Sequence, residues 1–399
     1  MKNRWKKGSI GRKNIHMRLT HADIVDPSFS LQKNRTLIIE EGRIVSVHES
    51  SVSESSSDED LDLSGMILIP GFIDLHIHGA LGADTSDGEV EGLKKISLYL
   101  AEKGVTSFCP TTMMIPKEKL TGALHAAEAF RKEAPPGARM LGVRLEGPFL
   151  SKQKCGVQNT EFAQDPSCEF IKEILKDLPE DLISIIDIAP ELEGASAFIS
   201  EMKEKYVLSA AHTAASYDVC RQAIDLGLSH GTHLFNAMEP LSHHAPGCVG
   251  ALLEDPSVTC ELICDGLHVH PAVLKIAFAV LGDRRAVVVS DAMRAAGMPD
   301  GEYDLGGTMV RVKNGRTDFG GGRFAGSTTD IYAEFRNLLD LKIPFETALR
   351  ACTLNPARVL NTDHETGSIE IGKYADLVAL DNEYNVQKVF VKGNLVYEK

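Results

Sequence analysis

The sequence predicts an α/β protein in which a (β/α)8 TIM-like barrel is joined to a small β-sandwich domain formed from both chain ends. Two observations predict the barrel: short apolar runs recur eight times between residues 72 and 293, and stretches of helical periodicity separate them. Apolar strands that alternate with helices indicate a parallel sheet covered on both faces. Eight such units over roughly 250 residues match the size of this barrel. A third observation, strand character at both ends of the chain, predicts the second domain.

The barrel strands are expected at the apolar runs, each of which is followed by a polar turn. In chain order these runs are residues 72–78, 106–112, 140–147, 184–191, 206–213, 228–235, 259–266 and 286–293. The helices expected between them include residues 90–104, 118–132, 216–227 and 271–282. All eight runs fall inside residues 69–351, which we therefore assign to the barrel.

The two chain ends share β-branched residues, alternating polarity and turn glycines, which are typical of strands. Residues 17–68 and 352–399 are therefore expected to form one β-sandwich domain together. Residues 1–16 differ from both, because they hold six basic residues and no acidic one. We expect them to be a disordered basic extension.

Charge and composition exclude several partners. The 399 residues include 42 Lys and Arg against 56 Asp and Glu, a formal charge of −14. Without the basic extension, 36 basic residues (42 less six) remain against 56 acidic ones, a charge of −20. Such a surface predicts no nucleic-acid partner, and no apolar run is long enough to predict a membrane partner. With no secretory signal and eight scattered cysteines that form no C-x-x-C pair, we expect a cytoplasmic protein.

Metal-capable side chains stand at the ends of the expected strands. They are His76, His78, Glu146, His212, His233, Asp265 with nearby His268, and Asp291. The carboxyl ends of barrel strands form the active-site face, so these side chains are expected to converge there. Alone, each could be an ordinary packing or capping residue. Their joint placement at the same end of successive strands predicts a metal site, in which His76 and His78, two apart on a strand, face the same way.

The ligand types narrow the chemistry to one or two divalent ions. Imidazole and carboxylate suit Zn²⁺ or Fe²⁺, and also accept Mn²⁺, Co²⁺ or Ni²⁺. An open site of nitrogen and oxygen ligands activates water. A carboxylate beside the metal can take the proton of that water and pass it to a leaving group. Asp291 is the best candidate for this role, whereas Glu146 is better placed as a ligand, which could also bridge two ions.

Seven motifs occur in order over residues 17–399: GFIDLHIHG, LEGPFL, AAHTAAS, GTHLFNAM, DGLHV, SDAMRAAGMPDGEYDLGG and FAGSTTD. With them the chain resembles the amidohydrolase superfamily, and specifically its N-acetylglucosamine-6-phosphate deacetylases. The H-x-H element alone would indicate only the superfamily. The LEGPF, THLFNAM and SDAM…YDLGG set is more specific to the deacetylases.

The resemblance implies roles for particular residues. Metal ligands would be Glu146, His212 and His233, and His76 and His78 are similar to those of members that hold two ions. Asp291 would be the catalytic acid/base, in contact with the metal. Substrate contacts would come from His268, Asn236, Ala237, Val157 and Gln158. The family also implies a homodimer.

One departure from the family pattern concerns the phosphate. Where the family has an Arg in R-x-P-G that grips the sugar phosphate, this chain reads HHAPG, with His244 at the Arg position and His243 before it. The two histidines could bind phosphate as a pair, form a surface turn without a ligand, or mark a changed or unphosphorylated sugar. Val157 stands where a small or hydroxyl residue is common, which leaves the identity of the sugar open as well.

The function that the resemblance implies is metal-dependent hydrolysis of the acetamide of an N-acetyl amino sugar phosphate, above all N-acetylglucosamine 6-phosphate. The alternatives are a deacetylase of a different or unphosphorylated amino sugar, another amidohydrolase such as a cyclic-amide hydrolase or deaminase, and a silent barrel that only binds. Many cyclic-amide hydrolases bridge their metals with a lysine of the fourth strand. Residues 184–191 contain no lysine, and the ligand set and Asp291 are intact, so the deacetylase interpretation is favoured.

Overall fold

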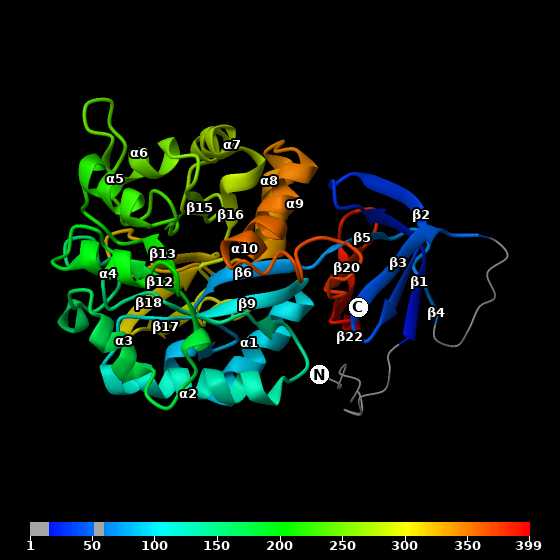
Figure 1. The fold of residues 1–399 in the computed structure, drawn as a ribbon, viewed down its shortest axis with the longest axis horizontal. Helices are drawn as coiled ribbons and strands as arrows, with labels where there is room; N and C mark the ends of the chain where they lie inside the picture. Colours follow the sequence, from blue (N-terminus) through cyan, green and yellow to red (C-terminus); the bar gives the residue numbers. More distant parts are fainter. Residues whose placement is uncertain (1–15, 52–59) are drawn as a thin grey trace.

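The computed structural model describes residues 16–51 and 60–399, so residues 1–15 of the expected basic extension lie outside it. Eight parallel strands form the predicted barrel (Figure 1). They are β6 (Phe72–Ile77), β9 (Val105–Thr112), β11 (Val143–Leu145), β12 (Ile183–Ile188), β13 (Val207–Ala210), β14 (His230–Gly231), β15 (Thr259–Leu262) and β16 (Ala286–Val288). Each overlaps one of the eight predicted runs. A short strand, β10 (Arg139–Met140), also pairs with β9.

The barrel closes just beyond the last strand. Ile77 forms a parallel bridge with Ala292. The N–H of Asp291 donates to the carbonyl of His76 over 2.9 Å, and that of His78 donates to Ala292 over 2.8 Å. The segment after β16 is thereby fixed beside the end of β6, which brings residues of the first and last strands together.

Helices cover the outside of the barrel (Figure 1). They are α1 (Val90–Glu102), α2 (Lys117–Glu133), α3 (Cys168–Ile174), α4 (Ala195–Met202), α5 (Tyr217–Leu226), α6 (Gly247–Glu254), α7 (Pro271–Arg285), α8 (Ile331–Asp340), α9 (Phe345–Cys352) and α10 (Leu354–Val359). Several begin where a side chain accepts a free backbone N–H: Ser167 starts α3, Ser216 starts α5 and Asp330 starts α8. Every residue of β6 and β9 is buried, as the near-continuous apolar runs predict.

The two chain ends build a second sheet, drawn in blue and red in Figure 1. Its strands are β1 (His16–Val25), β2 (Leu31–Glu40), β3 (Arg43–Glu49), β4 (Asp60–Asp62), β5 (Ile67–Pro70), β20 (Leu377–Leu380), β21 (Val386–Val391) and β22 (Asn394–Glu398). The order is β22-β21-β20-β5-β1-β2-β3, with β4 beside β1. The C-terminal strand β20 pairs antiparallel with the N-terminal strand β5, which confirms that both ends contribute.

The two wings of this sheet share one core. Leu37, Ile39 and Ile44 of the N-terminal wing are buried in the same cluster as Leu377 and Phe390 of the C-terminal wing. The wings are also joined at their rim, because the N–H of Ile44 donates to the carbonyl of Lys373 over 2.9 Å. The fold therefore has the predicted sandwich character, although the exact domain bounds stay a prediction.

Three features were not predicted. Helix α10 lies in the range assigned to the sandwich, yet Asn355 donates from Nδ2 to the carbonyl of Ala286 in the barrel over 2.9 Å. A small antiparallel sheet follows β16 and consists of β17 (Gly301–Leu305), β18 (Thr308–Lys313) and β19 (Arg316–Asp318). A two-stranded ribbon, β7 (Gly79–Ala80) with β8 (Ala83–Asp84), follows β6.

Among the helices of the described residues, none combines the length and the apolar character that a membrane span requires.

Candidate active site

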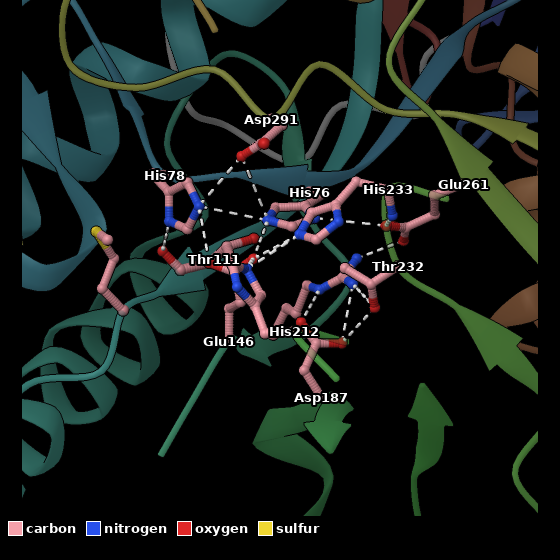
Figure 2. A network of polar contacts seen from close by, with 12 residues as sticks. His76, His78, Thr111, Glu146, Asp187, His212, Thr232, His233, Glu261 and Asp291 are labelled. Atoms are coloured by element: carbon pink, nitrogen blue, oxygen red, sulfur yellow. Dashed lines mark hydrogen bonds and ion pairs between the residues drawn. The ribbon is translucent and has the colours of Figure 1, made fainter. Parts of the chain in front are cut away.

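Six side chains from five strands meet at one end of the barrel, as can be followed in Figure 2. They are His76 and His78 at the end of β6, Glu146 after β11, His212 after β13, His233 after β14 and Asp291 after β16. All six are buried, with between 0% and 8% of their surface exposed. The predicted convergence at the carboxyl ends of the strands is thus present in the structure.

Glu146 lies at the centre of this cluster. Its Oε1 is 3.1 Å from Nε2 of His212, 3.1 Å from Nε2 of His233 and 3.5 Å from Nε2 of His76. Its Oε2 is 3.4 Å from Nε2 of His78. One carboxylate therefore faces four imidazole nitrogens, as a bridge between two groups of ligands would.

Two overlapping groups could each hold a metal ion, and both contain Glu146. One consists of Glu146, His212 and His233, and the other of His76, His78 and Glu146. Asp291 faces the second group, with Oδ1 at 3.3 Å from Nε2 of His78 and 3.5 Å from Nε2 of His76.

The other nitrogen of three of these rings faces an oxygen acceptor. Nδ1 of His78 lies 3.3 Å from the carbonyl of Thr111, and Nδ1 of His212 lies 2.9 Å from that of Lys154. Nδ1 of His76 lies 3.4 Å from a carboxylate oxygen of Glu261. A carbonyl or a carboxylate only accepts, so Nδ1 carries the proton in each ring. In the neutral imidazole Nε2 then bears a lone pair.

The Nε2 atoms converge closely. They are 3.2 Å apart between His212 and His233, and 3.3 Å apart between His76 and His78. Lone pairs that face each other and a carboxylate repel unless a proton or a metal ion lies among them. Nitrogen and oxygen donors in this arrangement fit a divalent cation such as Zn²⁺ or Fe²⁺.

The pKa values of the clustered side chains also indicate that positive charge is stabilised in this site. Burial would raise the pKa of Glu146, but the imidazoles of His212 and His76 outweigh it, and this pKa lies well below its usual range. Asp291 behaves alike, because His76 and His78 outweigh its burial and lower its pKa. Burial would lower the pKa of His233, but hydrogen bonding to Glu146 raises it to about 9. Both carboxylates are therefore anionic and attract cations.

The backbone is strained where three of the six residues stand. His212, His233 and Asp291 have φ angles of 42°, 29° and 47°, in the left-handed region that favours glycine. Such conformations cost about 1–3 kcal/mol each and persist where the surrounding fold holds them. Here they turn side chains from the strand ends toward a common centre.

The turn after Glu146 depends on a glycine and a buried amide. Gly147 has a φ of 108°, and a Cβ at this position would lie 2.9 Å from Cβ of Met114. Gln158 donates from Nε2 to Oε2 of Glu146 over 2.5 Å and accepts from the N–H of Met114 over 2.8 Å. Gln158, which we expected at the substrate, therefore supports Glu146, and its contact with substrate stays a prediction.

A fully buried charged network, which was not predicted from the sequence, lies beneath the site. Arg144 binds Asp187 through two hydrogen bonds of 3.0 Å and 2.9 Å and also contacts Glu261. The sequence does contain a pattern that points to Arg144: it stands two residues before Glu146, so both side chains point the same way from the strand. A charged residue within a buried apolar strand requires a partner, so the sequence indicates that Arg144 is paired but not with which carboxylate.

A second missed carboxylate, Asp74, anchors the start of the H-x-H segment. It accepts from Oγ of Ser290 over 2.5 Å and from the N–H of His76 over 3.1 Å. Burial raises the pKa of Asp74 to about 7, and the hydrogen bonds oppose that rise. Asp74 thereby ties β6 to the segment that carries Asp291.

His268 stands apart from the cluster, and its ring is held in place from two sides. Its Nδ1 lies 2.7 Å from Oδ2 of Asp265, and its ring packs on Phe324 with centroids 4.7 Å apart. Its Nε2 is buried and lacks a hydrogen-bond partner among the described residues. This atom is therefore available to a ligand. Phe324, in the loop after β19, was not predicted near it.

The other expected substrate residues occupy different surroundings. Asn236 is half-buried and donates from Nδ2 to the carbonyl of His233 over 3.2 Å, and Ala237 follows it in a left-handed conformation. Val157 is half-buried against the core. His243 and His244 are exposed, with ring centroids 4.0 Å apart, in the loop before α6.

The fold and this site define a hydrolase of the amidohydrolase type, and the amidohydrolase family model matches residues 67–396. An N-acetylglucosamine-6-phosphate deacetylase of Vibrio furnissii is 34% identical over 92% of both chains. An N-acetylgalactosamine-6-phosphate deacetylase of Escherichia coli O157:H7 is 35% identical over 90% of this chain and 94% of its own. The crystal structure of the N-acetylglucosamine-6-phosphate deacetylase of Pasteurella multocida is 31% identical and superposes with a TM-score of 0.89, over 96% of this chain and 100% of that one. The chain therefore belongs to the amidohydrolase family and, within it, to the N-acetylglucosamine-6-phosphate deacetylases, which confirms the resemblance.

Proposed function

We propose that this enzyme hydrolyses the acetamide of N-acetylglucosamine 6-phosphate to glucosamine 6-phosphate and acetate. One observation carries the proposal: four imidazole Nε2 atoms surround Glu146, with Asp291 beside them, at the active-site end of the barrel. The relative from Vibrio furnissii, named for this reaction, aligns over 92% of both chains and supports the substrate.

The donor geometry supports one or two bound ions. Glu146, His212 and His233 would hold one ion, and His76 and His78 with Glu146 would hold a second where two are bound. Zn²⁺ or Fe²⁺ fits these ligands best, and Mn²⁺, Co²⁺ or Ni²⁺ also suits them. A divalent ion bound here supplies the activation of water and the polarisation of the acetamide carbonyl.

Asp291 moves the proton in the proposed reaction. Its ionised carboxylate accepts a proton from the attacking water and returns it to the departing amine. Oδ1 faces His76 and His78 at 3.5 Å and 3.3 Å, so the carboxylate lies on the side of the site where the reacting atoms would be.

His268 would position the substrate and stabilise negative charge on the acetamide oxygen. Asp265 engages Nδ1 and fixes the ring, which leaves the partnerless Nε2 for the acetamide or the phosphate. Asn236 and Ala237 would contact the sugar phosphate, and Val157 and Gln158 the sugar. His243 and His244 would contribute to phosphate binding in place of the family's arginine.

A second candidate substrate is N-acetylgalactosamine 6-phosphate, the epimer at C4. It is favoured by the Escherichia coli O157:H7 relative that is named for that substrate, which is 35% identical to this chain.

Acetate release tests both candidates. The purified enzyme is assayed with the 6-phosphates of N-acetylglucosamine, N-acetylgalactosamine and N-acetylmannosamine, and with the three unphosphorylated sugars. We expect the highest kcat/KM for N-acetylglucosamine 6-phosphate. A preference for the galactosamine substrate would establish the second candidate instead, and equal rates with and without phosphate would contradict a sugar phosphate as the substrate.

We propose further that the enzyme is a cytoplasmic homodimer, as the family resemblance implies. Light scattering coupled to size-exclusion chromatography should give twice the mass of the chain, 43.4 kDa. Cell fractionation of the native host should recover the activity with the cytoplasm. A monomer that is fully active would contradict the dimer.

A further inference from the structure

Glu261, on β15, lies beside His233 and contacts residues of both ligand groups (Figure 2). Its side chain is fully buried. Oε2 lies 3.4 Å from Nδ1 of His76 and 3.3 Å from the backbone N–H of His233. Oε1 lies 3.0 Å from Nε2 of His230 and also accepts from Arg144. One carboxylate thus contacts the ring of one ligand candidate and the backbone of another.

Arg144 prevents Glu261 from turning away. Its guanidinium binds Glu261 on one side and Asp187 on the other, and Nη2 also donates to Oγ1 of Thr232 over 2.8 Å. Nη1 lies 3.3 Å from the carbonyl of Leu75, next to His76. A planar guanidinium with these fixed acceptors leaves the Glu261 carboxylate a single orientation.

His76 depends on a side chain for its orientation, unlike two of its neighbours. Backbone carbonyls fix the rings of His78 and His212 through Nδ1, and those carbonyls belong to strand ends and loops that the fold itself sets. The acceptor for Nδ1 of His76 is the Glu261 carboxylate. Removal of this one carboxylate therefore frees the His76 ring and leaves the other two supported.

We propose that Glu261, anchored by Arg144, is a positioning residue that keeps a proton on Nδ1 of His76 and holds Nε2 of His76 toward Glu146 and Asp291. The inference rests on the proposed metal-dependent function, because an oriented Nε2 matters as a ligand. Partners of this kind fix the tautomer of a ligand histidine, and their loss typically costs 10–100-fold in metal affinity.

The test measures metal binding directly. Metal-free wild type and the Glu261→Gln variant are titrated with Co²⁺ and with Zn²⁺ by calorimetry, and the Co²⁺ absorption spectrum is recorded at each step. The matched control is Asp376→Asn. Asp376 is also a buried carboxylate paired with an arginine, Arg139 at 3.1 Å, but it stands directly before β20 of the chain-end sheet. We expect the weakest-bound ion of Glu261→Gln to lose 10–100-fold in affinity and to show an altered Co²⁺ spectrum, and Asp376→Asn to match wild type.

The outcomes separate the role of Glu261 from the proposed metal-dependent function. Affinities of Glu261→Gln within twofold of wild type would overturn the role of Glu261 alone, because wild type would still bind metal and release acetate. Wild type that binds no divalent ion would overturn the proposed function as well. An equal loss in Asp376→Asn would show a general effect of a lost buried ion pair and would also overturn the role. If Glu261→Gln fails to fold, Glu261→Asp keeps the charge for Arg144 but withdraws the carboxylate from His76, and the same loss of affinity is expected.

Discussion

Asp291 and His78 approach each other across the closing seam of the barrel, with Oδ1 of Asp291 at 3.3 Å from Nε2 of His78. His78 follows the first barrel strand, and Asp291 follows the last. The side chain of Asp291 is 11% exposed, the largest value among the six clustered residues. A carboxylate that touches the ligand cluster and still reaches solvent is suited to exchange protons with water.

Replacement of this carboxylate by an amide should abolish proton transfer and leave the site intact. In Asp291→Asn the shape is kept, but the side chain no longer accepts a proton from water. We expect kcat to fall by about 10²–10⁴-fold, the usual contribution of general acid–base catalysis. Steady-state kinetics and elemental analysis check this, and metal content should match wild type. Turnover above a tenth of the wild-type value would contradict the assigned role.

Removal of metal should inactivate the enzyme and destabilise it. The converging Nε2 atoms and the two anionic carboxylates would lose the divalent cation that they bind, and the folded state would lose the free energy of metal binding. Dialysis against a chelator should eliminate acetate release, and Zn²⁺ or Fe²⁺ should restore it. The melting temperature should also drop, since a ligand at 100 times its Kd stabilises the folded state by about 2.7 kcal/mol. Full activity after removal of all detectable metal would refute metal dependence.

The cluster itself was predictable because strand position sets direction in a barrel. Apolar runs identify the strands, and the polar residue at the end of each run must lie at the same rim. His76, Glu146 and His233 could therefore be grouped before any coordinates, although they are far apart in sequence. The tight turns that bring them together, with positive φ at His212 and Asp291, follow from the fold and have no local signature.

The network under the site was not predicted because its pairs are remote in sequence. Arg144 and Glu261 are 117 residues apart, and they stand on β11 and β15, which do not pair with each other in the barrel. The approach of Phe324 to His268 likewise depends on the small sheet β17–β19, whose packing no periodicity indicates. Sequence patterns thus located residues at strand ends, whereas partners across the barrel required the structure.

The exposed histidine pair should respond to restoration of the family's arginine. Arginine binds phosphate through two parallel hydrogen bonds, which histidine does not offer. We expect His244→Arg to lower KM for N-acetylglucosamine 6-phosphate by about tenfold, which corresponds to roughly 1.4 kcal/mol. The unphosphorylated sugar serves as the control and should show no change. An unaltered KM for both sugars would indicate that the loop does not contact phosphate.

Glu334 offers a test of stability away from the catalytic cluster. It is fully buried on α8, and its Oε2 accepts the N–H of Cys264 over 3.0 Å. Its Oε1 has no hydrogen-bond partner among the described residues. Burial raises the pKa of Glu334 well above its usual range, and the nearby carboxylate of Asp265 raises it further. The folded protein therefore keeps a proton here that the unfolded chain releases near its ordinary pKa.

The stability of the wild type should consequently decline as pH rises, and Glu334→Gln should remove that part of the decline. Below the pKa of Glu334 in the unfolded chain, both the folded and the unfolded state hold the proton, and no stability is lost. Above that pKa only the folded state still holds the proton, so the free energy of unfolding falls as pH rises. Each unit by which the pKa is raised costs about 1.4 kcal/mol once pH exceeds the folded pKa. Urea unfolding at pH 5 and pH 8 checks this. Glu334→Gln should gain stability relative to wild type at pH 8, whereas Glu118→Gln, at an exposed position of α2, should not. Parallel pH profiles for wild type and Glu334→Gln would show that Glu334 is not the titrating group.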